Sequence, residues 1–317
     1  MRIKHLFILL TSLTLLDSSC SDKEQDLLQP PITTPVEEEK PKPESISGII
    51  KKNSTLIKTV RSDTSFSNYP GMTESYITYL NNQDKPIALY LLELDLTNEN
   101  LSIEVATPND NPVVNSVQRV SAMISAKNTS SPDKQVLAGI NGDYFNSPNP
   151  DGQQIPLGPV HKQGVQVRTE MSSGYMFFGM AENGNYLIGN NQEYLNYQSR
   201  LLEVIGGRHR ILTNGVIVSQ TDISVAPRTS VGVVSPKKVI MMVVDGRQEN
   251  HSVGYTLEQQ AEALKALGVR DAVNLDGGGS TVIITKDKSN QYKIKNKVSD
   301  GTERAVANAL LVVQKKN

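Results

Sequence analysis

The sequence predicts an α+β fold dominated by strands, with a few packed helices and with its site at strand-end loops. The first observation behind this prediction is that apolar runs rich in β-branched residues recur along the chain. The second is that one later segment carries a complete helix signature, with a cap, an apolar stripe and a glycine stop. The third is that several apolar runs end in short polar clusters rich in Gly and Asp, which are typical of turns at strand ends.

The first twenty residues are typical of an export signal. Arg2, Lys4 and His5 form a basic start, and residues 6–16 are an apolar run of eleven. A helix needs about 20 apolar residues to span a bilayer, so this run is too short to do so. Small residues precede Cys20, as in a bacterial lipoprotein signal, and this pattern predicts Cys20 as the lipidated N-terminus after cleavage. Alternatively, Cys20 is a bystander within an ordinary secretory signal.

Residues 21–48 predict a disordered tether between such an anchor and a folded domain, residues 49–317. The tether contains five prolines, the acidic run 37–39 and few large apolar side chains. Such a composition cannot bury enough surface to offset the entropy of ordering. The net charge of −1 and the lack of a basic cluster argue against nucleic-acid binding. We therefore expect an extracytoplasmic protein, on the periplasmic side or the cell surface, that meets the membrane only through its lipid anchor.

The first half of the domain predicts strands, a short helix and a long loop. Residues 87–96 and 101–105 alternate in polarity around a turn-like break, which predicts a hairpin with one buried face. Residues 117–127 fit a short helix, and residues 135–140 fit a strand. Residues 146–164 contain four prolines and three glycines and predict a long loop. Such loops are either binding loops or ordinary surface excursions.

The second half predicts a buried hairpin, the capped helix and further strands. Residues 231–234 and 239–244 are β-branched runs joined by a short polar turn. Thr256 and Gln259 form a capping box for the helix that follows, and Gly268 supplies its stop. The remaining predicted strands cover residues 269–275 and 309–313.

A glycine turn is the strongest local signal for a ligand site. The run Asn274-Leu275-Asp276-Gly277-Gly278-Gly279-Ser280-Thr281 follows one predicted strand and precedes another apolar segment. Three glycines in a row weaken any regular element, which is tolerated where the backbone needs positive φ or close approach. Successive N–H groups in that conformation can form a nest for an anion. Asp276 would stand at its edge.

Three further polar clusters also adjoin apolar strands, and the four together predict a site at one sheet edge. Each alone is compatible with ordinary turn chemistry. The three comprise Asn141-Gly142-Asp143-Tyr144-Phe145, Ala226-Pro227-Arg228-Thr229-Ser230 and Asp245-Gly246-Arg247.

The clusters occur in the order of a known family. From about residue 80 to residue 317 the sequence resembles the phosphodiester glycosidase family. The resemblance rests on Asn141-Gly142-Asp143-Tyr144-Phe145, Pro227-Arg228-Thr229-Ser230-Val231-Gly232, Val244-Asp245-Gly246-Arg247-Gln248, Ser252-Val253-Gly254-Tyr255-Thr256, Leu267-Gly268, Asn274-Leu275-Asp276-Gly277-Gly278-Gly279-Ser280 and Asp300-Gly301-Thr302-Glu303-Arg304-Ala305-Val306-Ala307-Asn308-Ala309-Leu310. The chain departs from the family at Thr281, where a second serine is common, so a hydroxyl role carries over to Ser280 only.

The resemblance implies hydrolysis of a sugar-1-phosphodiester between the anomeric carbon and the phosphate oxygen. Asp276 and Asp245 are the expected catalytic carboxylates, one of them acting as nucleophile or as base for water. Substrate and phosphate binding is expected from Arg228, Gly277, Gly278, Gly279, Ser280, Asn141, Asp143, Thr229, Glu303 and Arg304. Each has a structural alternative, such as a turn cap at Asp276, an Asx turn at Asp245 or an ion pair at Glu303–Arg304.

No cofactor is expected. His161, His209 and His251 lack the spacing of a transition-metal site. The alternative is a calcium or magnesium ion held by Asp143, Asp245 or Asp276, since such ions prefer oxygen ligands. Two other functions compete with the glycosidase: a lipoprotein that binds glycans or cell-wall phosphodiesters without cleaving them, and a phosphodiesterase that cleaves the P–O bond.

Overall fold

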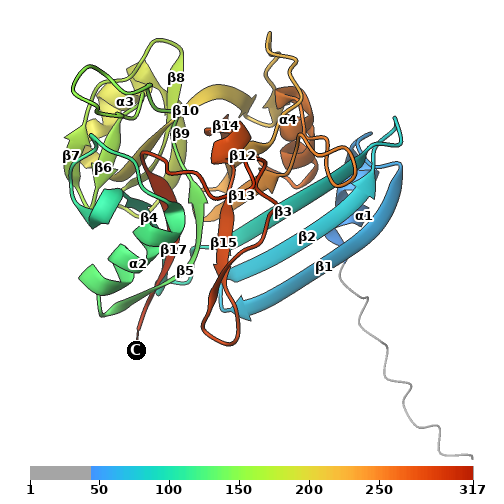
Figure 1. The fold of residues 1–317 in the computed structure, drawn as a ribbon, viewed down its shortest axis with the longest axis horizontal. Coiled ribbons are helices and arrows are strands. Elements are labelled where there is room, and N and C mark those ends of the chain that lie inside the picture. Colours follow the sequence, from blue (N-terminus) through green and yellow to red (C-terminus); the bar gives the residue numbers. More distant parts are fainter. Residues whose placement is uncertain (1–43, 317) are drawn as a thin grey trace, which may run out of the picture. The chain divides into compact units, whose positions relative to one another are not determined.

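The structure is a computed structural model that describes residues 44–316. These residues form two antiparallel sheets with helices against them (Figure 1). This arrangement confirms the α+β, strand-dominated fold predicted from the sequence. Cys20 and most of the predicted tether lie outside the described residues. The first helix begins at Ile46, so the last three residues assigned to the tether are helical.

The larger sheet has a main path of nine strands, with three more attached through β10 and β8. In spatial order the main path is β1 (Thr59–Tyr69), β2 (Met72–Leu80), β3 (Pro86–Asp95), β13 (Lys238–Val244), β12 (Arg228–Ser235), β14 (Asp271–Asn274), β10 (Leu201–Thr213), β6 (Val160–Lys162) and β7 (Val165–Arg168). The attached strands are β8 (Tyr175–Ala181), β9 (Tyr186–Asn190) and β11 (Val216–Ile217).

The smaller sheet has five strands. Their order is β16 (Tyr292–Ile294), β15 (Ile283–Lys286), β5 (Lys134–Asn141), β17 (Ala309–Lys315) and β4 (Leu101–Ala106). The helices are α1 (Ile46–Asn53), α2 (Val120–Ser130), α3 (Asn191–Tyr197) and α4 (Leu257–Ala266), with 3-10 turns at Pro108–Asp110, Gln198–Arg200 and Gly278–Ser280.

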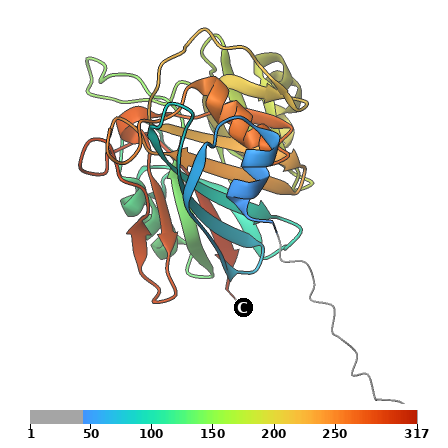
Figure 2. The same ribbon diagram turned by 90° about the vertical axis from the view of Figure 1, so that its right-hand side faces the viewer.

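Two apolar layers cover the two faces of the larger sheet. One face packs against the smaller sheet, where Leu92 and Met241 meet Ile140 and Leu310. The other face packs under α1 and α4, which Figure 2 shows side by side. A third layer buries α2 against the smaller sheet. None of the helices within residues 44–316 is long and apolar enough to cross a bilayer.

One predicted hairpin is wrong. Residues 87–96 and 101–105 form β3 and β4, but β3 pairs with β2 and β13 in the larger sheet, whereas β4 pairs with β17 in the smaller one. The short turn between them therefore carries the chain from one sheet to the other. β3 is buried along nearly its whole length, as expected of a strand between two apolar layers rather than of a half-exposed hairpin.

Other predicted elements are confirmed. β12 and β13 pair as an antiparallel hairpin. Helix α4 begins at the predicted capping box, in which Thr256 Oγ1 accepts from the Gln259 N–H and the Gln259 side chain accepts from the Thr256 N–H. The predicted strand 135–140 is β5, while the predicted helix 117–127 lies slightly later, as α2.

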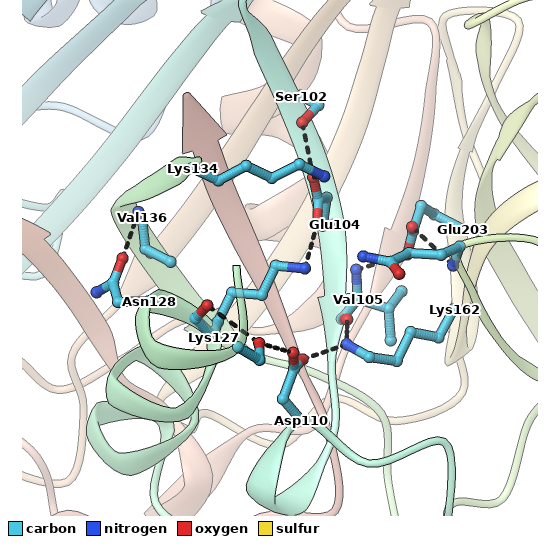
Figure 3. Close-up of polar contacts among 12 residues, drawn as sticks. Ser102, Glu104, Val105, Asp110, Lys127, Asn128, Lys134, Val136, Lys162 and Glu203 are labelled. Carbon is cyan, nitrogen blue, oxygen red and sulfur yellow. Dashed lines mark hydrogen bonds and ion pairs between the residues drawn. The ribbon is translucent and has the colours of Figure 1, made fainter. Parts of the chain in front are cut away.

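A network of buried charges fixes the seam between the sheets (Figure 3). β4 is the edge of the smaller sheet, so its outer N–H and C=O groups need other partners. Glu203 of β10 accepts from the Val105 N–H at 2.8 Å, and Lys162 of β6 donates to the Val105 carbonyl at 2.9 Å. Behind them, the Glu104 carboxylate pairs with Lys127 at 2.7 Å and Lys134 at 2.8 Å. Side chains of the larger sheet thus satisfy backbone groups at the edge of the smaller sheet.

Candidate active site

The glycine turn connects the two sheets, running from β14 of the larger sheet to β15 of the smaller one. It is held against the start of β12, where the Gly278 N–H donates to the Pro227 carbonyl at 2.9 Å. A Cβ at Gly277 would lie 2.7 Å from that carbonyl oxygen, and Gly278 has a φ of +61°. Glycine is therefore required for close approach at Gly277 and for left-handed backbone at Gly278.

The turn uses much of its own hydrogen-bonding capacity. The Gly277 N–H donates to Asp276 Oδ1 at 2.9 Å, and the Ser280 and Thr281 N–H groups donate back into the turn. Among the N–H groups of residues 275–281, only that of Gly279 has no acceptor within the described residues. The backbone nest expected for an anion is thus largely satisfied by the protein, and a bound phosphate would need a cationic side chain as well.

Asp276 is anchored through its backbone, and its carboxylate is only partly buried. Its N–H donates to the Gly142 carbonyl at 2.9 Å, and its carbonyl accepts from Asn141 Nδ2 at 2.6 Å. Burial raises the pKa of the Asp276 carboxyl to about 6, against the opposing effects of the Ser280 hydroxyl, the Gly277 N–H and the charge of Arg304. The residue therefore changes charge near neutral pH, as acid–base groups in active sites often do.

Asn141 brings three strand ends together. Besides its bond to Asp276, its Oδ1 accepts from Thr229 Oγ1 at 2.8 Å and from the Val282 N–H at 3.1 Å. Asn141 and Thr229 are both fully buried. Their side chains thus brace the loops rather than face a ligand in this structure.

Asp143 is fully buried and directly follows Gly142, whose carbonyl accepts from the Asp276 N–H. Its Oδ2 accepts from the Gly158 N–H at 2.7 Å, while its Oδ1 has no hydrogen-bond partner among the described residues. A Cβ at Gly206 would lie 2.3 Å from Oδ2, so this glycine makes room for the carboxyl. Burial raises the Asp143 pKa to about 7, and the negative charge of Asp276 adds to this effect. Gly158 belongs to the predicted long loop, which therefore packs against the site.

Arg228 turns its guanidinium toward the preceding loop. Its Nε donates to the Tyr255 carbonyl at 3.1 Å, and one terminal nitrogen donates to the Ser224 carbonyl at 2.6 Å. Asp222 lies 3.8 Å from the same nitrogen. Arg228 is almost fully buried, and its hydrogen bonds tie the start of β12 to the segments around Ser224 and Tyr255.

Asp245 has both carboxylate oxygens occupied by the protein. Oδ2 accepts from His251 Nε2 at 2.7 Å and from the Lys297 N–H at 2.9 Å, and Oδ1 accepts from Asn296 Nδ2 at 3.0 Å. Asn296 also donates to the Thr281 carbonyl at 3.1 Å. The carboxylate therefore ties the end of β13 to the segment after β16 and, through Asn296, to the glycine turn.

Glu303, Arg304 and Ser280 occupy supporting positions. Glu303 accepts from the Ser121 N–H at 2.9 Å and from its hydroxyl, in the first turn of α2. Arg304 pairs with Asp300 at 2.5 Å beside Gly279. Ser280 is buried, and its hydroxyl acts on the Asp276 carboxylate by lowering its pKa.

Arg247 is a site residue to which the sequence analysis gave no role. A Cβ at Gly278 would lie 3.2 Å from both of its terminal guanidinium nitrogens, so the guanidinium packs over the glycine turn. The residue is exposed and has a φ of +59°, which is uncommon for a side chain other than glycine. Its side chain makes no hydrogen bond or ion pair with the described residues, unlike Arg228 and Arg304. Its position directly after Asp245-Gly246 was the available signal.

Two tyrosines add an aromatic wall. Asn274 Nδ2 donates to Tyr144 Oη at 2.7 Å, and the Tyr144 and Tyr175 rings meet edge to face with centroids 6.3 Å apart. Burial raises the Tyr144 pKa, and the charge of Asp276 raises it further, which places this ring near the carboxylate. Such rings suit the apolar face of a sugar.

Within residues 44–316, no three His, Cys, Asp or Glu side chains are grouped closely enough to hold an ion.

The carboxyls, the glycine turn and the arginines described above lie within one segment of the chain that matches a known family. The family's sequence profile matches residues 134–313, and the chain belongs to the phosphodiester glycosidase family. No curated protein matches it by sequence.

Solved structures share its fold. The catalytic domain of zebrafish N-acetylglucosamine-1-phosphodiester α-N-acetylglucosaminidase, auto-inhibited by its pro-peptide, is similar at a TM-score of 0.59 and 20% identity, over 80% of this chain and 88% of that one. A hypothetical protein from Synechocystis is similar at 0.56 and 14%, over 80% and 64%. A protein from Burkholderia pseudomallei described as exported is similar at 0.50 and 14%, over 72% and 74%. At these identities the likeness establishes the fold alone.

Proposed function

We propose that this chain is an exported hydrolase that cleaves the glycosidic bond of a sugar-1-phosphodiester, releasing the sugar and a phosphomonoester. Membership of the phosphodiester glycosidase family supports the reaction class. The observation that carries the proposal is that Asp276 bonds through its N–H to the Gly142 carbonyl, directly beside Asp143, so that two carboxyls adjoin the glycine turn. Burial raises their pKa values to about 6 and about 7. Near neutral pH such a pair holds one proton, which favours one ionised and one neutral carboxyl.

Asp276 is the proposed catalytic carboxylate, because it is the less buried of the two and has the lower pKa. It acts at the anomeric carbon, either as nucleophile or as base for water. In the overall reaction the oxygen of water bonds to the anomeric carbon. The electron pair of the broken C–O bond leaves with the phosphate.

Asp143 is the proposed positioning residue. Its buried, neutral carboxyl allows Asp276 to ionise and adds no second negative charge beside the phosphate. We further propose Arg247 as the cation that meets the phosphate, since its guanidinium lies free over the glycine turn. Arg228 and Asp245 are proposed to hold the loops in place, in view of the partners that occupy them. No cofactor takes part in the proposed reaction.

The proposed location is extracytoplasmic, with a lipid on Cys20 as the membrane anchor. The signal-like start of the chain supports export. The structurally similar Burkholderia protein, described as exported, is in keeping with it. The proposed substrate class is a GlcNAc-1-phosphodiester-like sugar phosphate on the cell surface or outside the cell.

Release of sugar from a GlcNAc-1-phosphodiester by the purified protein tests this function. We expect turnover by the unmodified chain and by Asp151→Asn, which alters an exposed carboxylate. In Asp276→Asn we expect a loss of at least about a thousandfold in kcat with substrate binding retained. If the unmodified protein binds the substrate without any turnover, the non-catalytic lipoprotein is the better account.

A further inference from the structure

A cavity lies at the opposite ends of the strands from the candidate active site. It has a volume of about 750 Å³, which is within the range of ligand pockets. It is formed by the β1–β2 turn, the end of β3 and the β12–β13 turn. On β3, Leu89 is paired with Val244 beside the site and Asp95 with Lys238 at the cavity. Six residues of strand separate them, or about 20 Å, so the two places do not share a ligand.

The cavity is lined by side chains that both donate and accept hydrogen bonds. Ser67 and Thr73 pair across the β1–β2 hairpin at 2.8 Å, and Thr73 is in register with Glu93 of β3. Asn68 and Lys238 complete the polar wall. These groups come from three neighbouring strand ends and therefore sit on a rigid support.

Several of these groups are free to meet a ligand. Among the described residues, the side chains of Asn68, Glu93 and Lys238 make no hydrogen bond or ion pair. Two other charged groups are already engaged, since Lys237 donates to the Gly184 carbonyl at 2.8 Å and Asp95 accepts from Thr97. Burial raises the Glu93 pKa against the charge of Lys238, so this carboxyl lies inside the cavity wall rather than in open solvent.

The chemistry of the wall excludes most ligand classes. One free carboxyl and one free ammonium balance each other, which disfavours a simple anion or cation. A peptide adding as a strand needs a row of free backbone groups along an edge, whereas this cavity lies across strand ends. An uncharged ligand with donors and acceptors on every side fits the hydroxyl, amide and carboxyl groups. The ring of Tyr69 is not part of this polar wall, because it packs with Met72 and Leu94 against the apolar layer between the two sheets.

We propose that this cavity is a binding site for a linear oligosaccharide, separate from the active site. Its volume accommodates more than one sugar ring. The sugar hydroxyls are recognised by Asn68, Glu93 and Lys238. The site would hold a glycan chain at one end of the domain, and this role does not depend on the proposed hydrolysis.

Binding of chitotetraose, cellotetraose and maltotetraose, measured by titration calorimetry and by amide shifts in NMR, tests the proposal. We expect at least one to bind saturably, with shifts concentrated in residues 67–73 and 93–97. Glu93→Gln and Asn68→Ala should each weaken binding about tenfold, which is the loss of about one hydrogen bond. Lys238→Ala should weaken binding as well. Its control is Lys265→Ala, which removes an exposed lysine of α4 and should leave binding unchanged.

Two results overturn the proposal. One is that none of the three oligosaccharides binds at millimolar concentration. The other is a result that places the sugar outside the cavity: either the cavity variants leave binding intact, or the amide shifts centre on the glycine turn. Because the readout is binding, failure of the proposed hydrolysis would leave this test valid.

Discussion

Replacing Asp143 by Asn should uncouple stability from pH and change the pH dependence of activity. Burial raises the pKa of this carboxyl from 3.8 to about 7, roughly three pKa units at about 1.4 kcal/mol each. The folded state therefore binds the proton more tightly than the unfolded state. The associated stability is fully present below pH 3.8 and is lost as the pH rises through about 7.

The size of the effect follows from the same values. At pH 8 the raised pKa of Asp143 lowers the free energy of unfolding by about 4 kcal/mol. At pH 5, where the carboxyl is neutral in the folded state but ionised in the unfolded state, it lowers that free energy by between about 1 and 2 kcal/mol. The unmodified protein should thus lose about 2 to 3 kcal/mol more than Asp143→Asn between pH 5 and pH 8. The amide introduces its own cost, about 1 to 3 kcal/mol for a buried N–H without an acceptor, but that cost does not vary with pH.

Urea unfolding at the two pH values measures this difference directly. Activity supplies the second readout. The active pair needs Asp276 ionised and Asp143 neutral, so kcat/KM of the unmodified protein should be bell-shaped, with limbs at about 6 and about 7. In Asp143→Asn the high-pH limb should vanish while the low-pH limb remains. An unchanged high-pH limb, or the same loss of stability in both proteins, would refute the role given to Asp143.

Three further substitutions test other parts of the site. Arg247→Ala should raise KM for a sugar phosphodiester by about tenfold to a hundredfold, as a charge-assisted contact is lost; steady-state kinetics would contradict this if KM stayed unchanged. Gly277→Ala places a Cβ against the Pro227 carbonyl and should lower the free energy of unfolding by about 1 to 3 kcal/mol; a melting temperature equal to that of the unmodified protein would count against it. Asp245→Asn disrupts the bonds from His251 and its neighbours and should cost about 3 kcal/mol of stability, while a stable but inactive variant would return Asp245 to a catalytic role.

The sequence predicted the elements better than their partners. Period-two patterns located β3 and β4, apolar β-branched runs located β12 and β13, and a capping box located the start of α4. The same pattern could not tell that β3 and β4 belong to different sheets, because a turn between two alternating strands looks the same whether they pair or separate. Only the burial of both faces of β3 distinguishes the two cases, and burial depends on distant strands.

The sequence motifs likewise predicted which residues lie near the site better than they predicted what each residue does there. The motifs named Asn141, Asp143, Asp245 and Asp276, and the structure brings their strand ends together. Whether a carboxylate is free depends on groups far away in sequence. Asp245 is occupied by Asn296 and Lys297, about fifty positions later, and Asp143 owes its raised pKa to burial. Neither fact has a local signature.

The most direct test of the central claim is hydrolysis of a GlcNAc-1-phosphodiester in ¹⁸O-labelled water. Attack at the anomeric carbon, with Asp276 as nucleophile or base, places the oxygen of water on the sugar. We therefore expect the label in the released GlcNAc and none in the phosphomonoester, as read by mass spectrometry. Label in the phosphate would show that the P–O bond is cleaved and would contradict the assignment of Asp276 to the anomeric carbon.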